Sequence, residues 1–149
     1  MKKMIFVFTI ILLSIASFHS YAQVSFSKPK APEYEFISYE SADVYHDFKD
    51  DTYTYMVDST NEFEDSCIHI KLGKGKAESI NSLLNIVKMY EAGRDRDTIT
   101  LGGYDFTIDK KTNGINGESV MYATKAYEAG LYKIRIINLL GLADKIENN

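Results

Sequence analysis

A change of hydrophobic period between residues 67 and 93 constrains the fold of this chain more than any other feature. Residues 67–72 alternate between apolar and polar side chains, as a strand with one buried face does. After the tetrapeptide GKGK at 73–76 the period becomes about 3.6 residues, which predicts a helix over 77–92 with Gly93 as its C-terminal cap. A one-sided strand leading into an amphipathic helix is typical of the α+β class, in which one or two helices pack on an antiparallel sheet.

Part of this pattern returns further along the chain. The hexapeptide KMYEAG at 88–93 reappears as KAYEAG at 125–130, an offset of 37 residues. The same offset aligns two pairs of strand-like segments: 67–72 with 104–109, and 97–101 with 134–138. The two halves are joined by a tight LGGY connection at 101–104, which is typical of a hairpin. Two strand–helix–strand units in this order predict a ferredoxin-like βαββαβ arrangement over 67–138.

The second helix of that arrangement depends on the segment 118–129, which has two interpretations. Its Ala, Met, Lys and Glu residues favour a helix. An alternation typical of a strand also runs through Val120, Tyr122, Thr124 and Ala126. We predict a helix here; a strand would instead leave one main helix on a larger antiparallel sheet. Residues 141–146 are expected to add a final turn of helix.

The region 33–65 is strongly acidic, with eleven acidic residues against the single basic residue Lys49. Two of its segments, 34–39 and 52–57, are rich in the aromatic and β-branched residues that strands favour. The acidic residues between them show no clear period and predict a loop or a short helical turn. We therefore expect an extra acidic β-hairpin, which would cover the free face of the sheet where Lys71, Lys133 and Arg135 lie.

The first 22 residues have the three-part pattern of a secretory signal peptide. Lys2 and Lys3 precede an apolar run at 5–16, and small residues at positions 20 and 22 mark a cleavage site before Gln23. The alternative is an uncleaved N-terminal anchor. Cleavage predicts a protein exported to the periplasm or the extracellular space, and the short Lys-Lys start suggests a bacterial source. A flexible leader at 23–32, with both prolines, would then precede a single globular domain at 33–149.

Composition limits the partners and the covalent chemistry of the exported chain. Removing Lys2 and Lys3 leaves 15 basic residues against 21 acidic ones, so the chain has no general attraction for nucleic acid. No later apolar run is long enough to cross a membrane. Cys67 is the only cysteine, which excludes an internal disulfide; its thiol is either shielded by packing or pairs with another chain. Of the eleven tyrosines in the full sequence, all but Tyr21 remain in the exported chain, and they suit an interaction surface and ordinary strands alike.

The loop Gly73-Lys74-Gly75-Lys76 is a candidate anion-binding site. Unpaired amides at a helix N-terminus attract anions, and the two lysines add positive charge. The loop is not a P-loop, because a single residue separates its glycines and no Ser or Thr follows Lys76. Glu78 would also repel an anion near the amides. The alternative is a glycine turn with two solvated lysines.

A candidate metal site lies in the acidic region, at Asp43, His46 and Asp47. Residues three and four positions apart share one face of a helix, so these ligands would gather around a cation if the segment were helical. Their spacing does not match an EF-hand loop, which alternates acidic residues around a central glycine. The alternative is that they are solvated surface residues. We expect no cofactor.

Catalytic motifs are absent from the sequence. No serine lies in a G-x-S-x-G setting, and abundant carboxylates do not by themselves make an acid–base pair. This favours a binding role over an enzymatic one: a small exported, non-catalytic domain that contacts another protein or a small ligand. The alternative is an anion- or phosphate-ligand-binding protein, or a hydrolase, that uses the GKGK loop.

Overall fold

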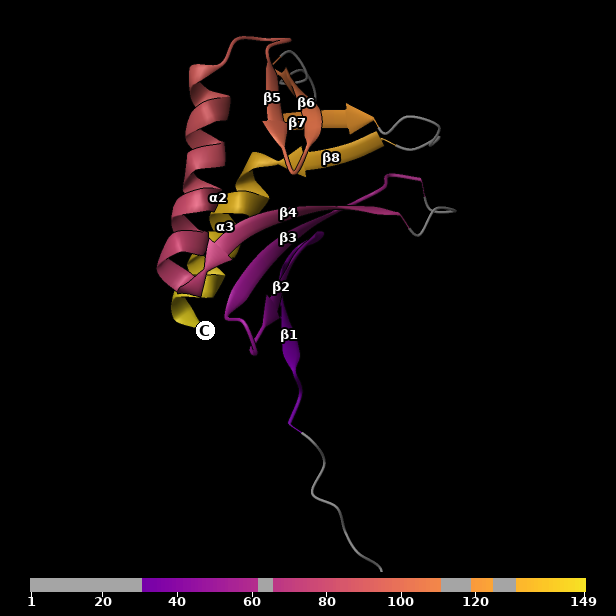
Figure 1. Cartoon of the computed structure of the whole chain (residues 1–149). Helices are drawn as coiled ribbons and strands as arrows, with labels where there is room; N and C mark the ends of the chain where they lie inside the picture. The colour runs from indigo at the N-terminus through magenta and orange to yellow at the C-terminus, as the bar shows by residue number, and fades with distance from the viewer. Residues whose placement is uncertain (1–30, 62–65, 111–118, 125–130) are drawn as a thin grey trace, which may run out of the picture. The chain divides into compact units, whose positions relative to one another are not determined.

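The computed structural model describes residues 31–61, 66–110, 119–124 and 131–149 (Figure 1). The chain divides into two units, Met1–Ala31 and Pro32–Asn149, and every element described below belongs to the second. The signal peptide predicted at 1–22 and nearly all of the leader predicted at 23–32 lie outside the described residues.

The described residues form two four-stranded antiparallel sheets and two helices, which places the fold in the α+β class as predicted. The first sheet contains β1 (Tyr34–Tyr39), β2 (Ala42–Asp47), β3 (Thr52–Asp58) and β4 (Cys67–Lys74). The second contains β5 (Thr98–Leu101), β6 (Tyr104–Asp109), β7 (Val120–Thr124) and β8 (Leu131–Arg135). Helix α2 (Gly75–Ala92) connects the sheets, and α3 (Ile136–Asn148) follows β8. In each sheet the strands are neighbours in chain order, so each is a meander.

The first sheet buries one face because its strands alternate. In β3 the residues Tyr53, Tyr55 and Val57 are buried, and in β4 the buried residues include Ile68 and Ile70, as the sequence predicts. The register aligns buried residues across the strands, for example Val44 with Tyr55 and Tyr55 with Ile70. Antiparallel sheets commonly bury one face in this way and leave the other polar.

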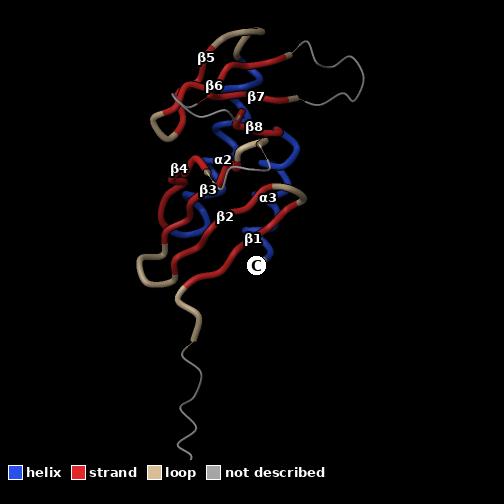
Figure 2. The backbone as a smooth tube through the Cα atoms, turned by 90° about the vertical axis from the view of Figure 1, so that its right-hand side faces the viewer, coloured by secondary structure: helices blue, strands red, loops and turns tan. Residues whose placement is uncertain are grey.

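Both helices pack on the buried side of the sheets. Figure 2 shows the strands in front and both helices behind them. Helix α2 buries Leu83, Ile86, Val87 and Tyr90, and α3 buries Leu139, Leu142, Ala143 and Ile146. These side chains and the inner residues of both sheets form one continuous hydrophobic core. Among the described residues, neither helix combines the length and apolar character needed to cross a membrane.

Helix α3 begins at the end of β8 in the second sheet and packs beneath β1 and β2 of the first. The approach to β1 is close: a Cβ atom added to Gly141 would lie 2.4 Å from two ring carbons of Tyr39. The strands of the two sheets also meet directly. Ser59 forms a bridge with Tyr132, and the Thr60 N–H donates to the Leu131 carbonyl oxygen at 2.7 Å.

The second sheet differs from the ferredoxin-like prediction. Val120–Thr124 is the strand β7, paired with both β6 and β8, and not part of a second helix. Its Val120, Met121 and Ala123 are buried, so tertiary packing outweighs the helix propensity of the segment. The echo at 125–130 lies outside the described residues. The hairpin predicted at 101–104 is present, with Gly102 and Gly103 both at positive φ.

The C-terminal elements also differ from the prediction. The strand expected over 134–138 ends at Arg135, and α3 begins at Ile136, five residues before the helical turn expected at 141–146. The apolar run from Ile136 to Leu140 suits either a strand or a helix, and the buried stripe of α3 continues from it at helical spacing.

The acidic region forms three strands and not a separate hairpin. The segment predicted as a loop contains β2, whose Ala42, Val44 and His46 are buried while the intervening acidic residues and Tyr45 point outward. The strands β1–β3 extend the sheet of β4 side by side, and they do not cover its free face. The free face of the first sheet therefore carries the acidic residues of β1–β3 together with the basic residues of β4.

Candidate functional site

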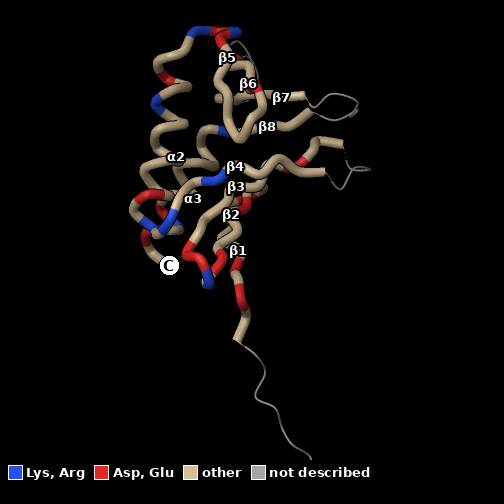
Figure 3. The backbone as a smooth tube through the Cα atoms, in the orientation of Figure 1, with Lys and Arg blue, Asp and Glu red and all other residues tan. Residues whose placement is uncertain are grey.

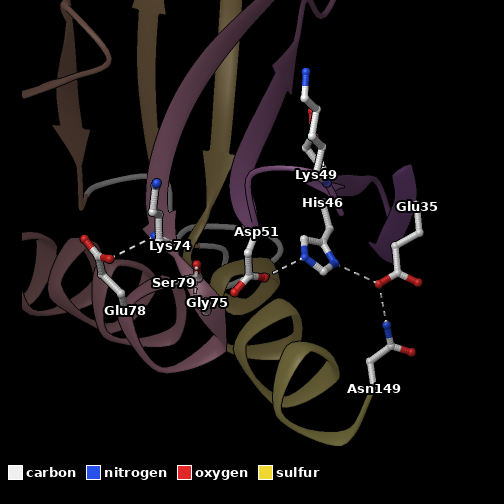
Figure 4. Close-up of polar contacts among 10 residues, drawn as sticks. Glu35, His46, Lys49, Asp51, Lys74, Gly75, Glu78, Ser79 and Asn149 are labelled. Atoms are coloured by element: carbon white, nitrogen blue, oxygen red, sulfur yellow. Dashed lines mark hydrogen bonds and ion pairs between the residues drawn. The ribbon is translucent and has the colours of Figure 1, made fainter. Parts of the chain in front are cut away.

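The GKGK loop lies where the sequence places it, between β4 and α2. Gly73 (φ +142°) and Gly75 (φ +68°) adopt backbone conformations that favour glycine. The Lys74 N–H donates to the Glu78 carboxylate at 2.9 Å, and the Gly75 N–H donates to the Asp51 carbonyl oxygen at 2.8 Å (Figure 4). Two of the amides that an anion would need are therefore bonded within the chain. An anion at Lys74 would have to displace a carboxylate that already occupies that position.

The side chains of Lys74 and Lys76 are exposed, as both interpretations of the loop require. Ser79 is buried and donates to the Gly75 carbonyl oxygen at 2.8 Å, which fixes the first turn of α2. The contacts of the loop thus explain its structure without a ligand, and its role in anion binding stays a prediction.

The candidate metal ligands lie on a strand and not on a helix. In β2, His46 faces the core, whereas Asp43 and Asp47 lie on the opposite face. Residues three positions apart on a strand point to opposite sides, so the strand separates ligands that a helix would have brought together. Within the described residues there is no group of three or more His, Cys, Asp or Glu side chains that could hold a metal ion.

His46 instead lies between the carboxylates of Glu35 and Asp51, and the sequence pattern gave no reason to expect Glu35 beside it. Its Nδ1 is 3.1 Å from Glu35 Oε1 and its Nε2 is 3.0 Å from Asp51 Oδ1 (Figure 4). The ring also stacks on the ring of Tyr53, with 3.9 Å between the centroids. Glu35 also accepts a hydrogen bond from the Asn149 side chain at 3.1 Å. A neutral imidazole has one N–H, so only the protonated ring donates to both carboxylates. This cluster joins three strands to the end of α3.

The outer face of the first sheet carries an exposed aromatic cluster, defined by Tyr34, Phe36 and Tyr45. The three ring centroids lie 5.2 to 5.8 Å apart, in tilted and edge-on arrangements. Tyr34 is 49% exposed and Phe36 is 54% exposed. Large apolar side chains normally stabilise a protein most when they are buried, so their exposure here is unusual. Partial burial raises the pKa of the Tyr45 hydroxyl, and the negative charge of Asp47 raises it further.

Charge is divided across this outer face. The register aligns Phe36, Tyr45, Thr54 and Lys71 in one row, and Tyr34, Asp47, Thr52 and Lys74 in the next. Acidic residues therefore flank the aromatic cluster in the register, and lysines lie at the opposite edge of the sheet, on β4. Figure 3 marks the acidic and basic residues along the backbone. Of the free-face residues predicted on β4, His69 and Lys71 are exposed and Cys67 is half-buried.

A cleft of about 260 Å³ lies where the end of β3 meets β8 and the first turn of α3. Its walls include Asp58 of β3, Lys133 and Arg135 of β8, and Ser41 from the turn between β1 and β2. The lining also includes Asn138 of α3, a polar residue that is 2% exposed.

Asn138 is incompletely hydrogen-bonded. Its Nδ2 lies 3.4 Å from Ser41 Oγ, which is a long hydrogen bond. Its Oδ1 is buried, and no described residue donates a hydrogen bond to it. Buried side-chain oxygens normally have a partner, so this amide is an exception that requires an explanation.

Sequence reasoning missed both the aromatic cluster and the cleft. Tyrosine enrichment suited an interaction surface and ordinary strands alike, and it gave no position, because the strand β2 was not predicted. Asn138 had a visible signal: it is the single polar residue within the apolar run at 136–140. Ser41 and Asp58 had none, because only the folded chain brings them close to α3. Comparison of the chain with protein-family models, with curated proteins and with solved structures finds no match.

Proposed function

We propose that the chain is a small exported, non-catalytic domain that binds a partner protein through the outer face of its first sheet. The observation that supports this proposal best is the exposed aromatic cluster Tyr34–Phe36–Tyr45. Aromatic side chains are enriched at protein interfaces because they bury a large area with few rotatable bonds. Three of them in mutual contact on a solvent-facing sheet offer the anchor that such an interface needs.

The position of the cluster indicates how the partner would bind. Among the described residues β1 pairs with β2 alone, so β1 is an end strand of the first sheet. An end strand presents backbone N–H and C=O groups that another extended chain can pair with. The proposed partner therefore supplies an extended segment that lies along β1 and packs apolar side chains on Tyr34 and Phe36.

The charge of the surrounding face indicates the chemistry of that segment. Asp47 is aligned with Tyr34, and Asp43 with Ser38, so carboxylates border the cluster on the β2 side. Opposite charges across an interface increase the association rate and exclude wrong partners. The segment is expected to combine aromatic or aliphatic residues with Lys or Arg, and its binding should weaken as the salt concentration rises.

The test compares two pairs of substitutions in exposed apolar residues. The first pair, Tyr34→Ser with Phe36→Ser, removes the cluster; the matched control, Met89→Ser with Ile137→Ser, removes apolar residues that are 41% and 58% exposed on the helices. Peptides displayed on phage are selected against the immobilised protein, and their affinities are measured by calorimetry. We expect the selected peptides to be basic and aromatic, and to lose at least tenfold in affinity for the first pair only. Equal affinity for both variants would contradict the proposal.

The alternative prediction, an anion-binding protein or hydrolase that uses Gly73, Lys74, Gly75 and Lys76, has less support. The bonds of Lys74 and Gly75 within the chain leave fewer amides for a ligand. Replacing Lys74 and Lys76 with Ala tests it directly: an anion-binding protein would lose affinity for phosphate or pyrophosphate, whereas an interaction domain would keep its peptide binding.

A further inference from the structure

We propose that the cleft between β3, β8 and α3 binds a small hydroxycarboxylate. The ligand carboxylate would lie against Lys133 and Arg135, and a ligand hydroxyl would bind the buried amide of Asn138. This binding site is separate from the aromatic cluster and does not depend on the partner protein proposed above.

The buried amide of Asn138 is the first argument. A buried oxygen without a donor is unfavourable, because it has lost its hydrogen bonds to water and gained none in return. Residues around it in α3, such as Leu139 and Leu142, are buried and apolar, so a leucine at position 138 would suit the local packing. A ligand that bound in the cleft and completed the hydrogen bonds of this amide would explain why an asparagine is present here.

The same amide selects a hydroxyl as the ligand group. The oxygen and nitrogen of an Asn side chain are assigned from their surroundings and can exchange places by a flip. In one orientation the group without a partner is an acceptor, and in the other it is a donor. A hydroxyl serves both orientations because it donates one hydrogen bond and accepts others, whereas an ammonium group serves only the first.

The charges of the cleft select a carboxylate. Lys133 and Arg135 lie two residues apart on β8, so their side chains share one face of the strand, and both line the cleft. The planar guanidinium of an arginine matches the two oxygens of a carboxylate. Among the described residues that line the cleft, Asp58 is the one acidic side chain, beside the basic side chains of Lys133 and Arg135. Hydrogen phosphate also carries negative charge and a hydroxyl, so it is the competing anion that the test below must separate from a carboxylate.

The size of the cleft limits the ligand. At about 30 Å³ for each water molecule, 260 Å³ corresponds to about nine waters. Pockets for drug-sized ligands begin at about 300 Å³, so this cleft suits a smaller molecule. Hydroxyl groups in the lining, including those of Ser41, Tyr55 and Thr60, would offer further hydrogen bonds to a polyhydroxylated acid.

The test is a titration of the ¹⁵N-labelled protein, purified from the producing cells and followed by NMR. Three hydroxycarboxylates (L-lactate, D-gluconate and D-glucuronate) are compared with acetate, D-glucose and inorganic phosphate. We expect saturable shifts at Arg135 and at the Asn138 side-chain amide with at least one hydroxycarboxylate. Acetate and glucose, which each lack one of the two groups, should bind at least tenfold more weakly. No saturable shift with any of the three acids, or equal shifts with acetate or phosphate, would overturn the proposal.

A pair of asparagine variants separates a binding role from a structural one. Asn138→Leu removes the amide and keeps a side chain of similar size; Asn81→Leu makes the same change at an exposed position of α2. We expect Asn138→Leu to weaken hydroxycarboxylate binding at least tenfold while its thermal midpoint stays the same or rises, and Asn81→Leu to bind normally. Unchanged binding by a folded Asn138→Leu protein would refute the assignment. If that variant does not fold, Arg135→Gln supplies the test, and unchanged carboxylate binding by it has the same meaning.

Discussion

The contact between α3 and β1 leads to a prediction that reverses the usual effect of a helical glycine. Gly141 lies inside α3, where glycine is about 1 kcal/mol less favourable than alanine. Propensity alone therefore predicts that Gly141→Ala stabilises the protein. The structure predicts the opposite, because the new Cβ would lie 2.4 Å from Cδ1 and Cε1 of Tyr39 and 2.5 Å from its Cγ.

The magnitude follows from these distances. Carbon atoms in favourable contact are about 3.5 to 4.0 Å apart, so α3 or the ring must move by about 1 Å. Rotation of the ring about its own axis does not relieve the contact, because Cγ lies on that axis. Overpacking of this kind costs about 1 to 3 kcal/mol. Set against the gain in propensity, the free energy of unfolding is expected to fall by about 1 kcal/mol.

Equilibrium unfolding in urea measures this change, and a second background isolates its cause. In the Tyr39→Ala background the obstructing ring is gone, so Gly141→Ala should raise the free energy of unfolding by about 1 kcal/mol. The sign of the substitution therefore reverses between the two backgrounds. If Gly141→Ala raised the urea midpoint in both, the close packing of α3 on β1 would be refuted.

Three further substitutions have defined outcomes. Gly73→Ala should lower the free energy of unfolding by about 1 to 3 kcal/mol, because the backbone has a φ of +142° at this position. The new Cβ would also lie 2.5 Å from Glu78, but the loss should persist when Glu78 is replaced by Ala as well. Recovery of stability by the double variant in urea unfolding would contradict this. Burial, together with the charges of Asp58 and Asp43, raises the pKa of Tyr55 above the unfolded value of about 10. The contribution of Tyr55 to stability is therefore fully present below about pH 10, and above it the free energy of unfolding falls by about 1.4 kcal/mol per pH unit. Tyr55→Phe should flatten this alkaline slope in urea titrations at several pH values, and an unchanged slope would count against it. His46→Ala should lower the free energy of unfolding by about 2 kcal/mol, but His46→Phe by less than about 1 kcal/mol, because phenylalanine keeps the packing of the ring on Tyr53. The carboxylate partners of His46 are partly exposed, so their loss should matter less. Equal losses for the two variants would show that the ion pairs matter more than the packing.

The sequence predicts best those elements whose period is unambiguous. The helix expected over 77–92 is present as α2, and the strands at 34–39, 52–57, 67–72, 97–101 and 104–109 correspond to β1, β3, β4, β5 and β6. In β3 and β4 the buried residues are those that the alternation indicates. Except in β1, whose outer face carries Tyr34 and Phe36, each of these segments has only one face that is apolar enough to bury.

The errors have a physical reason that local sequence does not contain. β2 carries acidic residues on its outer face, and the alternation of Ala42, Val44 and His46 on its inner face is too weakly apolar to predict a strand. β7 has helix-favouring residues but gains its stability from pairing with β6 and β8. The candidate metal ligands were grouped by helical spacing, so the change from helix to strand separated them. The cleft depends on Ser41, Asp58 and Asn138, which are far apart in the chain.

The meander order of each sheet has a consequence for the folding pathway. All strand pairs within a sheet join neighbours in the chain, so each sheet can form through local contacts, which fold fast. The helix that covers β1 and β2, however, is α3, made more than 90 residues after β1 begins. Part of the apolar face of the first sheet therefore stays exposed until α3 has been made and has packed against it. Removing α3 should therefore give a chain that forms strands but aggregates, because exposed apolar faces and unpaired strands associate.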